Sequence, residues 1–177
     1  MDVRPELQLQ TMIKAMTDIV LPAVDADNRL AQEQARLVIA TLQLVAKRLL
    51  IAYRYDRDEL TRYVALAADL LSAATPQLAG EVVTRLDLLA AQGAEVLARA
   101  RAEPLELETA VVALRASVGQ LTEASRAAHD PTLGRLVLAA AKVELDRERA
   151  LVVDSGFEAD PDDMPAPILE QLPPVYP

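Results

Sequence analysis

The positions of the prolines constrain the fold of this chain more than any other feature. Five of the eleven prolines precede residue 154, and they are Pro5, Pro22, Pro76, Pro104 and Pro131. Each lies at a gap between stretches in which apolar residues recur with helical spacing. Proline lacks a backbone N–H and clashes with the preceding turn, so it is tolerated at the first position of a helix but not inside one. The prolines therefore predict the joints of an all-helical protein.

Between these joints, apolar residues recur three and four positions apart, which places them on one face of a helix. The expected helices span residues 5–20, 27–54, 57–73, 76–101, 104–128 and 131–153. Hydrophobic residues make up 52% of the chain but aromatic residues only 3%, so the core must consist of aliphatic side chains that suit close helix packing. We expect an all-α helical bundle of four long and two shorter helices. At residues 73–76 no glycine forces a turn, and a kink in one continuous helix is the alternative there.

The last part of the chain differs in composition from the rest. Residues 154–177 contain six acidic and no basic residues, together with six of the prolines, whereas residues 1–153 have a net charge of only −3. This composition is typical of an extended segment without a core of its own. We therefore expect two parts, a helical bundle domain at 1–153 and an extended, acidic, Pro-rich C-terminal arm at 154–177.

Charge and composition also exclude several classes of protein. The chain has no cysteine, so disulfides, thiolate nucleophiles and cysteine metal sites are excluded. The net charge of −9 and the lack of a basic face argue against nucleic-acid binding. No stretch reaches the roughly 20 uninterrupted apolar residues that a membrane span requires, and the N-terminus does not resemble an export signal. We expect a cytoplasmic protein without a membrane span.

One row of polar residues on the second expected helix is unusual. Gln34, Thr41, Arg48 and Tyr55 recur at steps of seven and lie among leucine and valine, well away from the charged face of that helix. Arg48 would point partly into apolar surroundings, where a guanidinium needs an anionic partner or several carbonyls. A structural contact with another helix is one interpretation. The other is that the row binds the carboxylate or phosphate of a small ligand between helices.

Two segments have the composition of a binding surface. The stretch 53–63 combines aromatic and cationic residues that are enriched at interfaces, and its candidate residues are Tyr53, Arg54, Arg57, Arg62 and Tyr63. Ordinary capping and packing at a helix joint, with Asp56 or Asp58 as the cap, is the alternative interpretation. The arm carries apolar residues that could anchor it in a groove of its own bundle or of a neighbouring chain: Phe157, Ile168, Leu169, Leu172, Val175 and Tyr176.

No catalytic or metal-binding pattern is recognisable. His129, the single histidine, follows a helix beside Asp130 with Ser125 one turn earlier, but nothing in the sequence supplies a third member of a triad. Calcium-loop, di-iron and phosphate-loop templates all fail at required positions. We therefore expect no cofactor and no metal.

These observations favour a non-catalytic interaction or accessory protein that self-associates, or binds a partner protein, through the arm and segment 53–63. The alternative is a bundle that binds a small amphiphile or acyl-type ligand, with Arg48 at the polar end of its cavity. An enzyme of unknown type is the third hypothesis. No motif in the sequence points to a known family.

Overall fold

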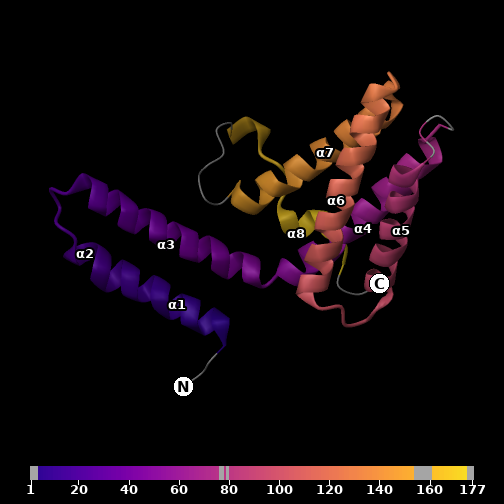
Figure 1. The fold of residues 1–177 in the computed structure, drawn as a ribbon. Helices are drawn as coiled ribbons and strands as arrows, with labels where there is room; N and C mark the ends of the chain where they lie inside the picture. The colour runs from indigo at the N-terminus through magenta and orange to yellow at the C-terminus, as the bar shows by residue number, and fades with distance from the viewer. Residues whose placement is uncertain (1–3, 76–77, 79, 154–160, 175–177) are drawn as a thin grey trace. The chain divides into compact units, whose positions relative to one another are not determined.

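The computed structural model describes residues 4–75, 78, 80–153 and 161–174, and every regular element among them is a helix (Figure 1). The prediction of an all-α helical protein is therefore confirmed. The described chain forms two compact units. The first comprises residues up to Ala52 together with 148–168, and the second comprises Tyr53–Arg147 and the residues from Leu169 onward.

The first unit is built on a hairpin of helices (Figure 1). Helix α1 (Pro5–Ala15) continues through a π-helical turn (Met16–Val20) into α2 (Leu21–Ala23), and α3 (Arg29–Leu49) packs against α1. The turn between them is held by Asn28, whose side chain accepts a hydrogen bond from the backbone N–H of Ala31, 3.1 Å away. Asn28 is thus the N-cap that begins α3.

The predicted joint at Pro22 is wrong, because Pro22 lies inside α2 and the chain turns at residues 24–28 instead. The wide π turn just before it changes the hydrogen bonding there: the backbone N–H of Leu21 donates to the carbonyl of Met16, five residues earlier. A proline can follow such a turn. Its missing N–H and its ring would disrupt the regular i→i−4 hydrogen bond of an α-helix, but here the π turn has already replaced that bond.

The break after α3 also lies earlier than predicted. Helix α3 ends at Leu49 and α4 (Ala52–Ala73) begins only three residues later, so the whole segment 53–63 belongs to α4. Asp56 and Asp58 are therefore not N-caps but residues within a helix. Helix α4 is 22 residues long, although its predicted range made it one of the shorter helices.

The second unit is a helical bundle of α4, α5 (Glu81–Ala98), α6 (Pro104–Ala127) and most of α7 (Pro131–Val152). Helix α4 ends at Ala73 and α5 begins at Glu81, so the two do not form one kinked helix. Pro104 and Pro131 occupy the first turns of α6 and α7 as predicted. Glu103 and Glu106 form a capping box at the start of α6, which satisfies backbone donors at that end.

The main core lies within the second unit. Its buried residues are mostly leucines contributed by α4, α5, α6 and α7, together with residues of the connecting loops: Leu60, Ala67, Leu70, Leu78, Leu86, Ala102, Leu107, Val111, Leu114, Val118, Leu121 and Leu133. This aliphatic core agrees with the low aromatic content of the chain.

The described part of the arm contains a 3-10 turn (Pro161–Asp163) and a short helix, α8 (Ile168–Gln171). Ile168 belongs to the first unit, whereas Leu169 and the residues after it belong to the second. Phe157, Val175 and Tyr176 lie outside the described residues, as does the start of the arm, so the predicted boundary at residue 154 remains a prediction.

Candidate functional site

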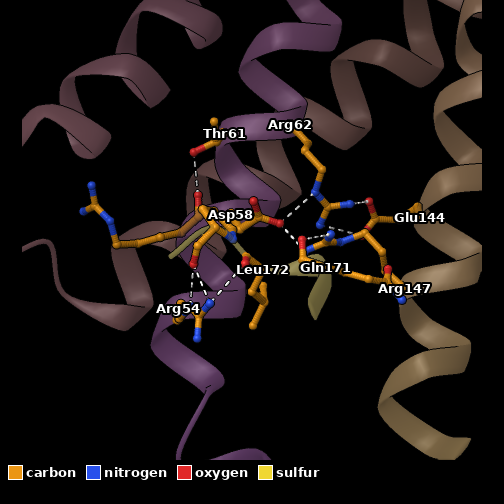
Figure 2. Close-up of polar contacts among 10 residues, drawn as sticks. Arg54, Asp58, Thr61, Arg62, Glu144, Arg147, Gln171 and Leu172 are labelled. Carbon is orange, nitrogen blue, oxygen red and sulfur yellow. Dashed lines mark hydrogen bonds and ion pairs between the residues drawn. The ribbon is translucent and has the colours of Figure 1, made fainter. Parts of the chain in front are cut away.

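The candidate site is the place in the second unit where the end of the chain meets α4 and α7 (Figure 2). We call residues 169–174 the terminal segment. Its Leu172 side chain is buried, with only 5% of its surface exposed. Two prolines follow Leu172 directly, and so short a segment does not form a hydrophobic core of its own. An isolated leucine buried in this way indicates an apolar docking position for the segment.

Two arginines hold the main chain of the terminal segment. The Arg54 guanidinium, from α4, donates through Nε to the carbonyl of Pro173 at 2.8 Å and through Nη2 to that of Leu172 at 3.0 Å. Arg147, from α7, donates through Nη1 to the carbonyl of Gln171 at 3.0 Å. All three acceptors are main-chain oxygens at or just after the C-terminal end of α8, where carbonyls have no partner within the helix, and the Leu172 side chain is the sequence-specific part of the contact.

A cluster of ion pairs fixes Arg147 in place (Figure 2). Arg147 pairs with Asp58, and the same Asp58 oxygen accepts a bond from Arg62 at 3.1 Å. Arg62 in turn pairs with Glu144. The Arg147 and Asp58 side chains are only 7% and 11% exposed. Two carboxylates thus balance two guanidinium groups in a largely dry environment, as burial of charge requires. We call this cluster together with Arg54 the arginine site.

Two other predicted interface residues, Arg57 and Tyr63, make contacts within the bundle. Arg57 donates to the carbonyls of Leu97, at 2.7 Å, and Arg99, at 3.3 Å, and so satisfies carbonyls at the C-terminal end of α5. The Tyr63 hydroxyl accepts a bond from Arg115 at 3.0 Å, and Tyr53 is 39% exposed. Of the predicted interface, the structure brings Arg54 and Arg62 to the arginine site and seats Leu172 there. Leu169 is exposed.

The predicted ligand-binding row is divided between the two units. Arg48 belongs to the first unit, where its Nε and Nη2 donate to the carbonyl of Leu151 at 3.3 and 3.2 Å. Thr41 donates its hydroxyl to the carbonyl of Leu37 in its own helix. Tyr55 belongs to the second unit, where Arg147 lies 5.9 Å from the centre of its ring. Gln34 is exposed on α3, and a ligand role for this row remains a prediction.

A separate apolar groove of about 550 Å³ lies between α4, α6 and α7 in the second unit. Its walls are aliphatic, formed chiefly by Leu66, Val118, Leu136, Val137 and Val143. Arg62, Arg115 and Glu144 stand at one end, while Asp69 lies two turns further along α4. The groove therefore combines an apolar floor with charged ends.

The charges near this groove are mostly paired. Arg115 donates through Nη2 to Glu59 at 2.7 Å and through Nε to Tyr63, which leaves Nη1 without a partner among the described residues. Burial raises the pKa of the Glu59 carboxyl, although the charge of Arg115 acts in the opposite direction. Burial, followed by the charge of Glu108, also raises the pKa of the nearby Asp56 carboxyl.

The residues once considered for catalysis have structural roles. The Ser125 hydroxyl is buried and donates to the backbone carbonyl of Asp130 at 2.6 Å. His129 has a positive φ of 59° in the turn between α6 and α7. Within the described ranges there is no group of three acidic or histidine residues able to hold a metal ion. None of the described helices combines the length and the apolar character that crossing a membrane takes.

Sequence analysis missed three residues of the arginine site. It considered Asp58 only as a possible helix cap, and it did not single out Glu144 or Arg147. The signal was the spacing on α7, because Glu144 and Arg147 continue the series of Leu133, Leu136 and Ala140 on its inward face. Charged residues at apolar positions of a helix indicate a buried ion pair.

Comparison with known protein-family models, with curated proteins and with solved structures gives no match.

Proposed function

We propose that this chain is a non-catalytic interaction protein whose docking site for a short segment of chain is the arginine site. One observation carries the proposal: Leu172 is buried at the same place where three successive carbonyls, of residues 171–173, accept hydrogen bonds from Arg54 and Arg147. A site that binds main-chain carbonyls and one leucine can hold any segment with that pattern. Recognition of this kind requires binding geometry and no catalytic group.

The terminal segment is the natural first ligand of this site. Within one chain the segment binds the arginine site at a high effective concentration. A segment from a second copy competes for the site only at high protein concentration. Exchange of the segment between copies would form the same contacts and give self-association at low cost. We propose this exchange as the route by which the arm and segment 53–63 take part in self-association.

The test measures binding of the segment in trans. A fluorescently labelled peptide of residues 168–177 is titrated with the Leu172→Ala protein, and its binding is measured by fluorescence anisotropy. The substitution weakens the chain's own segment, since loss of a buried leucine costs about 2–5 kcal/mol. We expect the peptide to bind this variant about tenfold or more tighter than the wild-type chain, whose own segment competes.

Two further variants make the test specific. Adding Arg54→Ala to the Leu172→Ala chain removes the donors to Leu172 and Pro173, and peptide binding should be lost. Adding Arg36→Ala is the matched control, because Arg36 lies in the first unit and donates to Gln32 on its own helix, at 3.4 Å. A Leu172→Ala chain that keeps its helical circular dichroism and does not bind the peptide would contradict the proposal.

Binding of a small amphiphile is a second candidate function, favoured by the groove between α4, α6 and α7. Its volume lies within the range of small-molecule sites, and the spare Nη1 of Arg115 could receive a carboxylate while the aliphatic walls cover a chain. The polar end would then be formed by Arg115 rather than by Arg48.

Glycine substitutions test this candidate. Gly119 lines the groove, and a Cβ atom added there meets nothing within 4 Å, so Gly119→Leu should fill the groove without disturbing the bundle. Binding of a fluorescent medium-chain fatty acid should fall at least about tenfold, as expected when a side chain occupies a ligand's place. Gly134→Leu is the control, since Gly134 has equal free space but does not line the groove. Equal binding by both variants would exclude the groove as the site.

A further inference from the structure

The terminal segment contains the one pair of adjacent prolines in the chain, Pro173 and Pro174, directly after Leu172. Both prolines are exposed, whereas Leu172 is buried. The proline rings therefore add little buried apolar surface to the contact with the arginine site. What the prolines contribute lies in the backbone that they shape.

One guanidinium group bonds to two successive carbonyls of this segment. Nε of Arg54 donates to the carbonyl of Pro173 at 2.8 Å, and Nη2 donates to that of Leu172 at 3.0 Å (Figure 2). Because Nε and Nη2 lie on the same edge of the planar guanidinium, the two oxygens must lie side by side. Successive residues of an extended strand face opposite sides, so a strand does not offer two adjacent carbonyls to one edge. The contact with Arg54 therefore selects a particular backbone conformation.

The two prolines fix this conformation. Peptide groups are planar, so the relative orientation of the carbonyls of residues 172 and 173 depends only on φ and ψ of residue 173. The ring of Pro173 holds this φ at about −65°, and Pro174 confines the ψ of the residue before it to extended values. At these angles a chain completes a turn every three residues instead of every two, which brings neighbouring carbonyls closer to the same side. The pair of acceptors for Arg54 is thus formed before the segment docks.

The helical turn before the prolines supplies a third acceptor. Arg147 donates at 3.0 Å to the carbonyl of Gln171, the last residue of α8, where a helix leaves its carbonyls without partners. Pro173 disfavours helical angles at the residue before it, which explains why α8 ends at Gln171. Among the described residues Arg54 bonds to no carboxylate, so the carbonyls of the segment are the acceptors of its guanidinium there.

We infer that the arginine site is specific for the sequence Leu-Pro-Pro at the end of a helical turn, and that a partner protein which docks there carries this sequence. The inference rests on the proposed docking function and deepens it by naming the ligand. The leucine fills the apolar position, the prolines present the carbonyl pair to Arg54, and the helical turn presents one further carbonyl to Arg147. A segment with the same leucine and freely rotating residues in place of the prolines loses more conformational entropy when it docks.

The test compares labelled peptides of residues 168–177 on the full-length Leu172→Ala chain by fluorescence anisotropy. We expect Pro173→Ala/Pro174→Ala in the peptide to weaken binding about tenfold, because the carbonyl pair is no longer fixed. Leu169→Ala is the control peptide, since Leu169 is 58% exposed, and it should bind like the wild-type peptide. In the intact protein, the same double proline substitution should let the wild-type peptide bind more tightly than it binds to the wild-type chain, because the chain's own segment then competes less.

A second receptor variant shows whether the prolines act through Arg54. Lysine donates as a point charge and has no rigid edge for two carbonyls, so on the Leu172→Ala/Arg54→Lys chain the double proline substitution should weaken peptide binding by less than about threefold. Equal losses on the arginine and lysine chains would overturn the inference, as would a peptide without these two prolines that binds as tightly as the wild-type peptide. Both outcomes leave the proposed function intact, because the wild-type peptide binds in each. Failure of the wild-type peptide to bind contradicts the proposed function and the inference with it.

Discussion

At the scale of single residues, the contact between Arg147 and Asp58 has the largest energetic consequence. Both side chains are nearly buried, and Asp58 is shared between Arg147 and Arg62. Removing one member of a buried ion pair leaves an uncompensated charge, which costs about 3–5 kcal/mol. Removing both members costs much less than the sum of the single losses, because no charge is then left unpaired.

We therefore expect Arg147→Met to lower the free energy of unfolding by about 3–5 kcal/mol in urea denaturation. Asp58→Asn should lower it as well, and the double variant should be less destabilised than the two single effects predict. Arg126→Met is the control, since its pair with Glu123 is 78% and 69% exposed, and it should cause no measurable change. Additive losses in the double variant would show that the pair is not coupled.

At the scale of elements, the packing of α5 onto its neighbours depends on Gly93. A Cβ atom at this position would lie 2.9 Å from Cγ2 of Val64 on α4 and 3.4 Å from Cδ1 of Leu114 on α6. A side chain at this position requires Val64 or its helix to shift. Gly119, in the middle of α6, faces open space instead, so its lack of a side chain serves no packing purpose.

Two alanine substitutions should therefore have opposite effects on thermal unfolding. Gly119→Ala should raise the free energy of unfolding by about 0.5–1 kcal/mol, because alanine has the higher helix propensity. Gly93→Ala gains the same propensity but overpacks the core, at a cost of about 1–3 kcal/mol, and should lower the melting temperature. A stabilised Gly93→Ala variant would mean that α4 and α5 pack less closely than the structure shows.

At the scale of the whole molecule, the two units have very different cores. The second unit contains the large leucine cluster, in which Leu107, Leu114 and Leu121 on α6 have no exposed surface. The first unit buries only three small or aliphatic residues among those described. Local stability follows the amount of buried apolar surface.

Amide hydrogen exchange should report this difference. In dilute protein, we expect the amides of α6 to exchange only through global unfolding and those of α1 and α3 to exchange orders of magnitude faster through local opening. Equal protection of α3 and α6 in dilute protein would contradict the assignment of a small core to the first unit.

How far the sequence predicts the fold is clear from the prolines. Pro5, Pro104 and Pro131 begin helices as predicted, because a missing N–H and a fixed φ act locally and need no tertiary partner. Pro22 does not, since a π turn accommodates it within the first helix. The break near residue 50 contains neither glycine nor proline, and local sequence carries no strong signal for it.

The candidate site is less accessible to sequence reasoning. The composition of 53–63 indicated a binding segment, but only the fold shows that Arg57 and Tyr63 bond within the bundle while Arg54 holds the terminal segment. Arg54 lies 119 positions from the carbonyl that it binds, and Asp58 lies 89 positions from Arg147. By itself the sequence determined the helical class, most helix starts and the aliphatic character of the core, because these follow from local backbone chemistry and periodicity. Which charges are buried together, and where the terminal segment docks, was decided by tertiary structure alone, because helix packing brings together residues that no local pattern connects.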